Sequence, residues 1–585
     1  MQHSWKLILA AALAVVAAPA TAAEPFERPS VIRFGAHTAE LQTALAGQCA
    51  SLTIRRIDPP FLPAIKDKQT QIDCEGFAFR GSPRHVEFVI GDDTLQMVWL
   101  MLTPAEMDAT RDAMQARYGA PTHSNAAYVA FEHDGAALRP GKAEILFYAP
   151  QLQAAMDPDF SGAVYADRAA WAADLDALYA EMQAKHPDLY RRHGKAEWDA
   201  RHAALHAAIL RLDWPHFVVA LHRFVALAGD GHTNLLSTDI AGPGFDTRYN
   251  VRFGLFWDGL YVLSASSDIR QAIGGRVLAV NGHPIAAVAR ALAGLTGHDS
   301  PMWAANWVPL LLSYPGNVAG LDFGTLGAPL RLTLKTMDGK TIDVAVPFSI
   351  TENPPKRLTV FDVLHNGHTL PAWWSPDAPL TFDYRPDSKT VYAVFGSVAD
   401  GDTQTLKQLS DALYAFVAAH DTQRLIFDVR NNGGGDNTLL APLIDGAKAF
   451  EAGHPGGLYV IIGRQTFSAA ENFVTRMERR TGALFAGEPT GESPNQDGEP
   501  EVYHLPRTLL PVLISTRRWD ESDPADRRSA TLPDLPAHLN FAQFANGRDP
   551  ALEAALAYDP SRAPAQTGPR WKRASQHAAW GKPLP

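Results

Sequence analysis

Two short polar turns carry the residue types that acyl-transfer chemistry needs. Residues 466–473 read T-F-S-A-A-E-N-F, which places Ser468 between an apolar run and an amphipathic stretch. Upstream, residues 428–435 read D-V-R-N-N-G-G-G and close another apolar run. A serine hydroxyl attacks a carbonyl when a base takes its proton and N–H donors receive the charge on the carbonyl oxygen. The two turns together therefore predict a serine nucleophile beside an oxyanion hole.

Both turns supply backbone donors to this predicted oxyanion hole. If Ser468 begins a helix, the N–H of Ala469 is among the unpaired donors of the first turn, at the positive end of the helix dipole. The second donor is expected from the glycine turn, where Gly434 or Gly435 lets the backbone approach a substrate closely. Gly435 and Ala469 are the predicted pair.

Each turn also has a purely structural interpretation. Ser468 followed three residues later by Glu471 is the pattern of a capping box, in which the serine hydroxyl starts a helix. The run N-N-G-G-G is by itself usual for a flexible turn. The ordered succession of strand, glycine turn, helix, strand, serine turn, helix and strand favours the functional interpretation.

The elements around these turns are expected to form a layered α/β core. The predicted strands are 391–398, 424–430, 458–463 and 483–487, and the predicted helices are 403–420, 438–450 and 468–481. Alternation of this length predicts parallel strand pairing. Active sites in such cores gather in the loops beyond the strand ends, where both turns lie.

The pattern changes several times along the chain and predicts a multidomain α/β protein. The predicted parts are a signal peptide at 1–22, an α+β accessory domain at 24–155, a helical domain at 160–240, a PDZ-like β-rich region at 241–360, the α/β core at 375–558 and a disordered tail at 559–585. The PDZ-like assignment rests on G-G-R-V-L-A-V-N-G-H-P-I at 274–285. A β-hairpin with an Asn-Gly turn looks similar locally.

A series of motifs resembles the tail-specific (C-terminal processing) protease family, which includes the tricorn core protease and the interphotoreceptor retinoid-binding protein. The matching strings are D-G-H-T at 230–233, R-L-I-F-D-V-R-N-N-G-G-G at 424–435, T-F-S-A-A-E at 466–471, A-L-F-A-G-E-P-T-G at 483–491, L-P-D-L at 532–535 and G-R-D-P-A-L-E-A-A-L at 547–556. The similarity covers about residues 167–557. It implies a crotonase-like fold for the core and maps Ser468 to the nucleophile.

Within this resemblance the general base could be a lysine or a histidine. Tail-specific proteases use a lysine in the loop after G-E-P-T, but here that loop reads G-E-S-P-N-Q-D-G, with Ser493 at the lysine's place. No lysine occurs between Ser468 and Lys572. Tricorn-like members use a histidine that matches His232 in G-D-G-H-T. Imidazole titrates near neutrality, so His232 is the predicted base.

A histidine base usually has a carboxylate partner that fixes its tautomer. The resemblance to tricorn implies one shortly before the pair Pro533-Asp534, where the chain reads D-E-S-D-P-A-D-R-R. Asp526 is nearest to the expected place, and Glu521 and Asp523 are alternatives. The segment could instead be a solvated acidic loop.

The two residues before His232 have different expected roles. Asp230 is expected to cap the turn rather than to take part in catalysis. Gly231 stands where tricorn has a serine, so that second orienting group is missing from this chain.

Composition and the N-terminus indicate an exported globular protein. Of 585 residues, 46% are hydrophobic and 20% are charged. A net charge of −11 without a basic run argues against nucleic acid or anionic lipid as a main partner. Lys6, the apolar run 7–18 and the small-residue string 20–22 form a signal peptide that is too short for a membrane span. We therefore expect a periplasmic or secreted protein without membrane insertion.

The two cysteines, Cys49 and Cys74, both lie in the accessory domain. In an exported protein they are expected to form one disulfide, worth about 3 kcal/mol on the chain-entropy model. Two unpaired buried thiols are the alternative.

Taken together, the motifs predict a serine peptidase that hydrolyses peptides or unfolded chains. No cofactor or metal is expected, because no H-E-x-x-H or Cys/His ligand cluster occurs. Substrates could add as an edge strand to the PDZ-like region. The alternative is a catalytically inactive protein that binds peptides or apolar ligands on the same scaffold, as the retinoid-binding member exemplifies.

Overall fold

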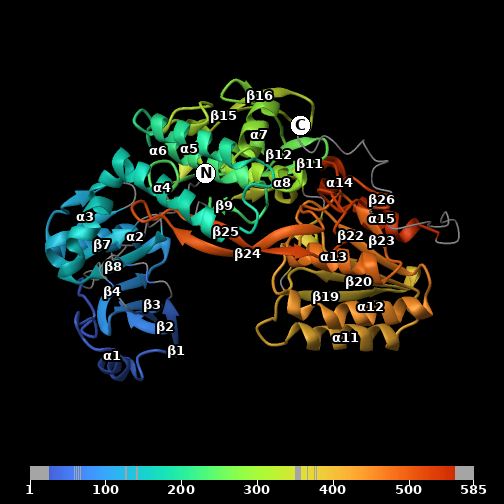
Figure 1. Cartoon of the computed structure of the whole chain (residues 1–585), viewed down its shortest axis with the longest axis horizontal. Helices are drawn as coiled ribbons and strands as arrows, with labels where there is room; N and C mark the ends of the chain where they lie inside the picture. The colour runs from blue at the N-terminus through green and yellow to red at the C-terminus, as the bar shows by residue number, and fades with distance from the viewer. Residues whose placement is uncertain are drawn as a thin grey trace, which may run out of the picture. The chain divides into compact units, whose positions relative to one another are not determined.

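The computed structural model describes residues 25–559, apart from gaps at 58–59, 61, 63–64, 66–67, 125–127, 140–141, 350–356, 365–366, 375 and 377. The predicted signal peptide and the tail from 560 onward lie outside the described residues. Among the described helices, none combines the length and the apolar character that crossing a membrane requires. The fold is a mixed α/β, multidomain one, and the chain divides into two compact units (Figure 1).

The first unit comprises the described residues up to Ala155, apart from 128 and 142, which belong to the second. It holds an eight-stranded antiparallel sheet in the order β1-β2-β3-β4-β8-β7-β6-β5. The strands are β1 (Ser51–Ile57), β2 (Gln69–Phe79), β3 (Ser82–Gly91), β4 (Thr94–Met101), β5 (His123–Ser124), β6 (Val129–Phe131), β7 (Ala136–Arg139) and β8 (Glu144–Tyr148). Helices α1 (Thr38–Leu45) and α2 (Met107–Tyr118) pack on the apolar core of this sheet through buried leucine and methionine side chains.

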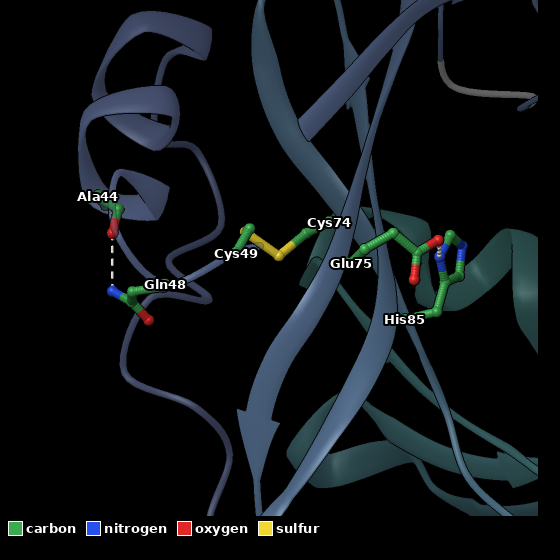
Figure 2. The surroundings of a disulfide bond; sticks show 6 residues. All are labelled: Ala44, Gln48, Cys49, Cys74, Glu75 and His85. Carbon is green, nitrogen blue, oxygen red and sulfur yellow. Dashed lines mark hydrogen bonds and ion pairs between the residues drawn. A yellow bond between two sulfur atoms is a disulfide. The ribbon is translucent and has the colours of Figure 1, made fainter. Parts of the chain in front are cut away.

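A disulfide joins Cys49 to Cys74, and this confirms the pairing predicted from the sequence. It ties the segment after α1 to strand β2 (Figure 2). The same figure shows Gln48 donating to the carbonyl of Ala44 at 2.7 Å, which holds the end of that segment against α1. The crosslink therefore fixes a helix that otherwise contributes few buried residues.

Three helices open the second unit: α4 (Arg168–Lys185), α5 (Lys195–Ile209) and α6 (Trp214–Val225). Asp167 and Asp213 accept backbone N–H groups at the starts of α4 and α6. Their shared core is aromatic, with the rings of Trp171 and Phe217 stacked 4.7 Å apart. After α6 a short 3-10 turn ends at Gly229 with φ of +72°, and this turn begins the G-D-G-H-T motif.

A seven-stranded sheet follows, with the order β11-β12-β13-β15-β16 along its main path, while β14 pairs with β13 and β18 with β12. Its strands are β11 (Val251–Phe256), β12 (Gly259–Ala265), β13 (Arg276–Val280), β14 (His283–Pro284), β15 (Leu330–Lys335), β16 (Thr341–Val346) and β18 (Leu358–Thr359), with α7 (Ile285–Ala293) and α8 (Pro301–Leu311) against them. Asn281 and Gly282 both have positive φ and join β13 to β14, so this string forms the Asn-Gly hairpin. The PDZ-like assignment stays a prediction.

The core sheet has the order β19-β20-β21-β22-β23-β26, parallel from β20 onward. Its strands are β19 (Leu380–Arg385), β20 (Thr390–Phe395), β21 (Arg424–Asp428), β22 (Leu458–Ile462), β23 (Leu484–Gly487) and β26 (Leu535–Pro536). Helices α11 (Leu406–Ala419), α12 (Ala441–Gly453) and α13 (Ala469–Arg480) cover one face, and α15 (Pro550–Ala557) covers the other. A parallel sheet buried on both faces explains the continuous apolar strands.

A long hairpin of β24 (Asn495–His504) and β25 (Pro511–Asp520) links the core to the helical part of the same unit (Figure 1). Strand β25 pairs with β9 (Asn234–Leu235), directly after the histidine motif. At the tip, Asp174 of α4 accepts the N–H groups of Arg507 and Thr508 at 2.9 and 2.8 Å. The hairpin thereby holds the histidine turn against the core.

Candidate active site

Ser468 lies in a strained turn between β22 and α13. Its backbone has φ of +55° and ψ of −126°, a region that non-glycine residues adopt only at a cost of about 1–3 kcal/mol. Its hydroxyl makes no capping hydrogen bond to the helix, so the capping box with Glu471 is not formed. The turn therefore presents the hydroxyl away from the helix end.

His232 is the partner of this hydroxyl. Its Nε2 atom lies 2.9 Å from Oγ of Ser468. The imidazole comes from the turn after α6, and it is buried. The structure thus brings together the nucleophile and the base that the sequence motifs predict. A hydroxyl at this distance donates to a neutral imidazole, which is the arrangement for proton transfer.

Asp230 shapes the turn that carries His232. Its Oδ1 atom accepts the backbone N–H groups of His232 and Thr233 at 2.9 and 2.8 Å and the hydroxyl of Ser515 at 2.8 Å. Its Oδ2 atom lies 2.9 Å from Nε2 of His186. Burial opposes ionisation, but His186 outweighs it and holds the pKa of Asp230 at about 2. Asp230 is a turn-capping carboxylate, in line with its expected role.

The carboxylate beside the imidazole is Glu492, which sequence reasoning missed. Its Oε1 atom lies 3.0 Å from Nδ1 of His232, and its Oε2 atom accepts the backbone N–H of Ser468. The side chain is completely buried. Glu492 directly precedes Ser493, which stands at the place of the family's lysine in the loop after G-E-P-T-G. The distance along the chain from Ser468 to that place could therefore have pointed to Glu492 as a partner of the site. Ser493 itself donates to the carbonyl of Arg528 at 2.7 Å.

Buried charges determine the protonation of His232. Burial opposes the charged imidazolium, but Glu492, with Asp230 and Asp299, outweighs it and raises the pKa of His232 to about 9. Burial also raises the pKa of Glu492, while His232 acts in the opposite sense. The imidazolium form of His232 is therefore stabilised by the carboxylate of Glu492 beside it.

The structure does not bring Asp526 to His232, so that expected contact is wrong. The carboxylate of Asp526 lies 2.8 Å from Nη2 of Arg528 and accepts the hydroxyl of Ser522 at 2.7 Å. Arg528, two residues along the chain, binds both oxygens of Asp526. Such a charge-assisted contact is stronger than the neutral hydrogen bond from Ser522. Of the two alternatives, Glu521 pairs with Arg476 and Asp523 caps the following turn.

The glycine turn packs directly on the serine turn. A Cβ atom on Gly434 would lie 2.5 Å from Cβ of Ser468 and 2.8 Å from the backbone nitrogen of Ala469. A Cβ atom on Gly435 would lie 2.1 Å from the carbonyl oxygen of Val398. Both glycines also have positive φ. The N–H of Gly434 donates to Asn432 Oδ1 at 2.9 Å. Within the described chain, neither the N–H of Gly435 nor that of Ala469 has such an acceptor.

An aromatic ring fills the space beside Gly231. A Cβ atom there would lie 2.4 Å from the ring of Phe467. That ring contacts the imidazole of His232, with centroids 4.5 Å apart, and stacks on Trp303 at 3.8 Å. The ring of Phe467 therefore packs against His232 beside Gly231, the position at which tricorn has a serine.

One fully buried set of potential metal ligands lies near the histidine turn within the described chain: His186, Asp230 and Asp497. Their ligand atoms lie within 4.8 Å of one another. Each group already has protein partners, because His186 contacts Asp230 while Arg191 and Arg518 pair with Asp497. Hydrogen bonds and arginine contacts account for this cluster without an ion.

Comparison with known proteins used family models, curated proteins and solved structures. No family model and no curated protein matches the chain. Mature CPAF complexed with lactacystin is 14% identical with a TM-score of 0.47, over 67% of this chain and 96% of CPAF. The photosystem II D1 C-terminal processing protease is 14% identical with a TM-score of 0.32, over 66% of this chain and 96% of the protease.

The tricorn protease is 12% identical with a TM-score of 0.28, over 84% of this chain and 45% of tricorn. The structural neighbours include proteases. Two of them, the D1 C-terminal processing protease and tricorn, are of the kinds that the sequence motifs resemble.

Proposed function

We propose that the protein is a serine peptidase in which Ser468 attacks a peptide carbonyl and His232 acts as general base and then general acid. The observation that carries the proposal is the 2.9 Å separation between Nε2 of His232 and Oγ of Ser468. Serine becomes nucleophilic only with such a base in hydrogen-bond reach.

The remaining groups of the site fit the same reaction. As Ser468 bonds to the carbonyl carbon, its proton passes to His232, and the carbonyl oxygen takes up negative charge. The N–H groups of Gly435 and Ala469 are the donors proposed for that oxygen. Glu492 stabilises the imidazolium. His232 then donates the proton to the leaving amine, and a water molecule hydrolyses the acyl-enzyme by the same steps in reverse.

Peptides and unfolded protein chains are the proposed substrates, and the periplasm or the cell exterior is the proposed location. Strand β24 passes the site: Gln496 donates to the carbonyl of Ser468 at 3.3 Å, and a Cβ atom on Gly498 would lie 3.6 Å from Cε1 of His232.

A comparison of two serine variants tests the proposal. Ser468→Ala should abolish both labelling by an active-serine phosphonate and turnover of a peptide library. Ser493→Ala is the matched control, since Ser493 has the lysine's place but contacts Arg528, and it should keep both. Equal labelling and turnover in wild type and Ser468→Ala would remove Ser468 as nucleophile. Peptide binding without any turnover in the wild type would favour the inactive binding protein.

A further inference from the structure

Glu471 is a buried carboxyl group without a cation to neutralise it. It lies in the first turn of α13, three residues after Ser468, and is fully buried. Its Oε1 atom accepts the hydroxyl of Thr531 at 2.7 Å. Its Oε2 atom is buried without a hydrogen-bond partner among the described residues. The guanidinium of Arg528 acts on this carboxyl group, but it is itself bound by Asp526 and Glu478.

This carboxyl group connects the nucleophile helix to the segment that presents Glu492. Thr531 donates its backbone N–H to Oγ1 of Thr490 at 2.8 Å and accepts the N–H of Thr490 at 3.1 Å. The hydroxyl of Thr490 donates to the backbone carbonyl of Glu492 at 3.1 Å. A short chain of hydrogen bonds therefore runs from Glu471 through two threonines to the residue beside His232.

We propose that Glu471 is a neutral carboxylic acid in the folded protein and that it positions Glu492 against the nucleophile helix. An isolated ionised carboxylate in such a place costs several kcal/mol of desolvation. The positive end of the helix returns at most about 2 kcal/mol to an anion. The neutral form is therefore the more stable one.

Burial and the neighbouring Glu492 both favour the neutral form of Glu471. Burial raises the pKa of Glu471 well above its ordinary value, the hydroxyls of Thr531 and Thr490 lower it, Glu492 raises it and Arg528 lowers it. Glu492 thus disfavours a second negative charge, and Arg528 is already paired with Glu478 and Asp526. The effect of Glu471 on catalysis rests on the proposed peptidase function. Its protonation state does not depend on that function.

Thermal unfolding of the full-length protein tests the protonation state without any activity. The folded protein keeps the proton of Glu471 while the unfolded chain loses it above about pH 4.5, so wild type loses stability as pH rises. Glu471→Gln lacks this loss. The difference in Tm between the variant and wild type should therefore grow by about 2–5 °C between pH 5 and pH 8. A difference that stays constant or shrinks would overturn the neutral acid.

Kinetics of the same variants test the positioning role. Glu471→Gln keeps the shape and the neutral charge, so kcat should stay within about 3-fold of wild type. Glu471→Ala should lower kcat by about 10–100-fold with little change in KM. Glu451→Gln on α12, whose carboxylate accepts the N–H of Gly482, is the control for a glutamate change elsewhere in the core.

The two sets of outcomes separate the inference from the proposed function. If Glu471→Gln loses as much kcat as Glu471→Ala, a charged role replaces the neutral one. If no variant and no wild type turns over peptide, the proposed function fails, and the Tm comparison still decides the state of Glu471. If Ser468 is active and the Tm difference is flat, the inference alone fails.

Discussion

Glu492 Oε1 lies 3.0 Å from Nδ1 of His232, on the edge of the ring opposite to the nitrogen that faces Ser468. The pair has the distance of an ion pair, but not the alignment of a good hydrogen bond, since neither atom has a well-directed partner. Glu492 is therefore placed to hold the ring and to stabilise its charge.

The pH dependence of catalysis should report this contact. His232 must be neutral to accept the serine proton, and its pKa is raised to about 9, so kcat/KM of wild type should rise with pH and reach half its maximum near that value. Glu492→Gln removes the main group that raises the pKa. The midpoint should then move to lower pH by about 1–3 units. An unchanged or higher midpoint, from rates measured between pH 6 and pH 10, would contradict the assignment.

Amide substitution of Glu492 should lower catalysis, whereas amide substitution of Asp526 should lower stability. Glu492→Gln should lower kcat by about 10³–10⁴-fold at saturating substrate, the range known for losing the carboxylate of a serine–histidine pair. Asp526→Asn weakens the contact to Arg528 and should cost about 1–3 kcal/mol of stability with kcat changed by less than about 3-fold. Steady-state kinetics and urea unfolding on both variants measure the two effects. A large loss of kcat in a well-folded Asp526→Asn protein would return Asp526 to the site.

Gly434→Ala should damage the oxyanion hole through a steric clash. The new methyl group would lie 2.5 Å from Cβ of Ser468, at a backbone φ of +105°. The two turns must then separate, which displaces the N–H donors, and we expect kcat to fall by about 10²-fold. Gly433→Ala is the control, because a Cβ there meets no atom within 4 Å. Equal rates for the two alanine variants would show that the close packing of the turns is not needed.

Phe467 and Gly231 should be coupled in a double-mutant cycle. Gly231→Ala alone brings a methyl group against the ring of Phe467 and should disturb the ring that contacts His232. Phe467→Ala alone removes the ring. The double variant should be more active than the sum of the single effects predicts, with a coupling of about 0.5–3 kcal/mol in kcat/KM. Additive effects would mean that the ring does not control the position of the base.

The sequence motifs singled out Ser468 and His232, which the structure brings together, but not Glu492. Ser468 and His232 each sit in a string whose local order is distinctive, so a resemblance could place them. The position of the Glu492 side chain depends on the path of the chain just before β24. That path is set by the pairing of β24 with β25 and of β25 with β9, which no local motif reveals. The spacing in tricorn predicts an acid shortly before Asp534, and Asp526 stands there. Its carboxylate is paired with Arg528 instead of His232.

The predicted strands of the core match observed ones because each has an apolar middle and ends near a turn signal. The predicted strand at 424–430 is observed as β21 at Arg424–Asp428, and the predicted helix at 468–481 as α13 at Ala469–Arg480. Patterns of this kind carry no information on which distant segments meet. The capping of the β24–β25 turn by Asp174 joins residues more than 300 positions apart, and no local pattern announces it.

That cap bears on the order in which the molecule assembles. The core sheet is built from neighbouring segments, so it can form while the hairpin is still loose. A chain at that stage has its serine turn in place but no imidazole, because His232 is held beside Ser468 by the pairing of β9 with β25, and Asp174 fixes the far end of that hairpin. For the proposed peptidase, the reacting pair therefore depends on contacts between segments hundreds of positions apart, and a chain without the hairpin contacts would hold Ser468 without its base.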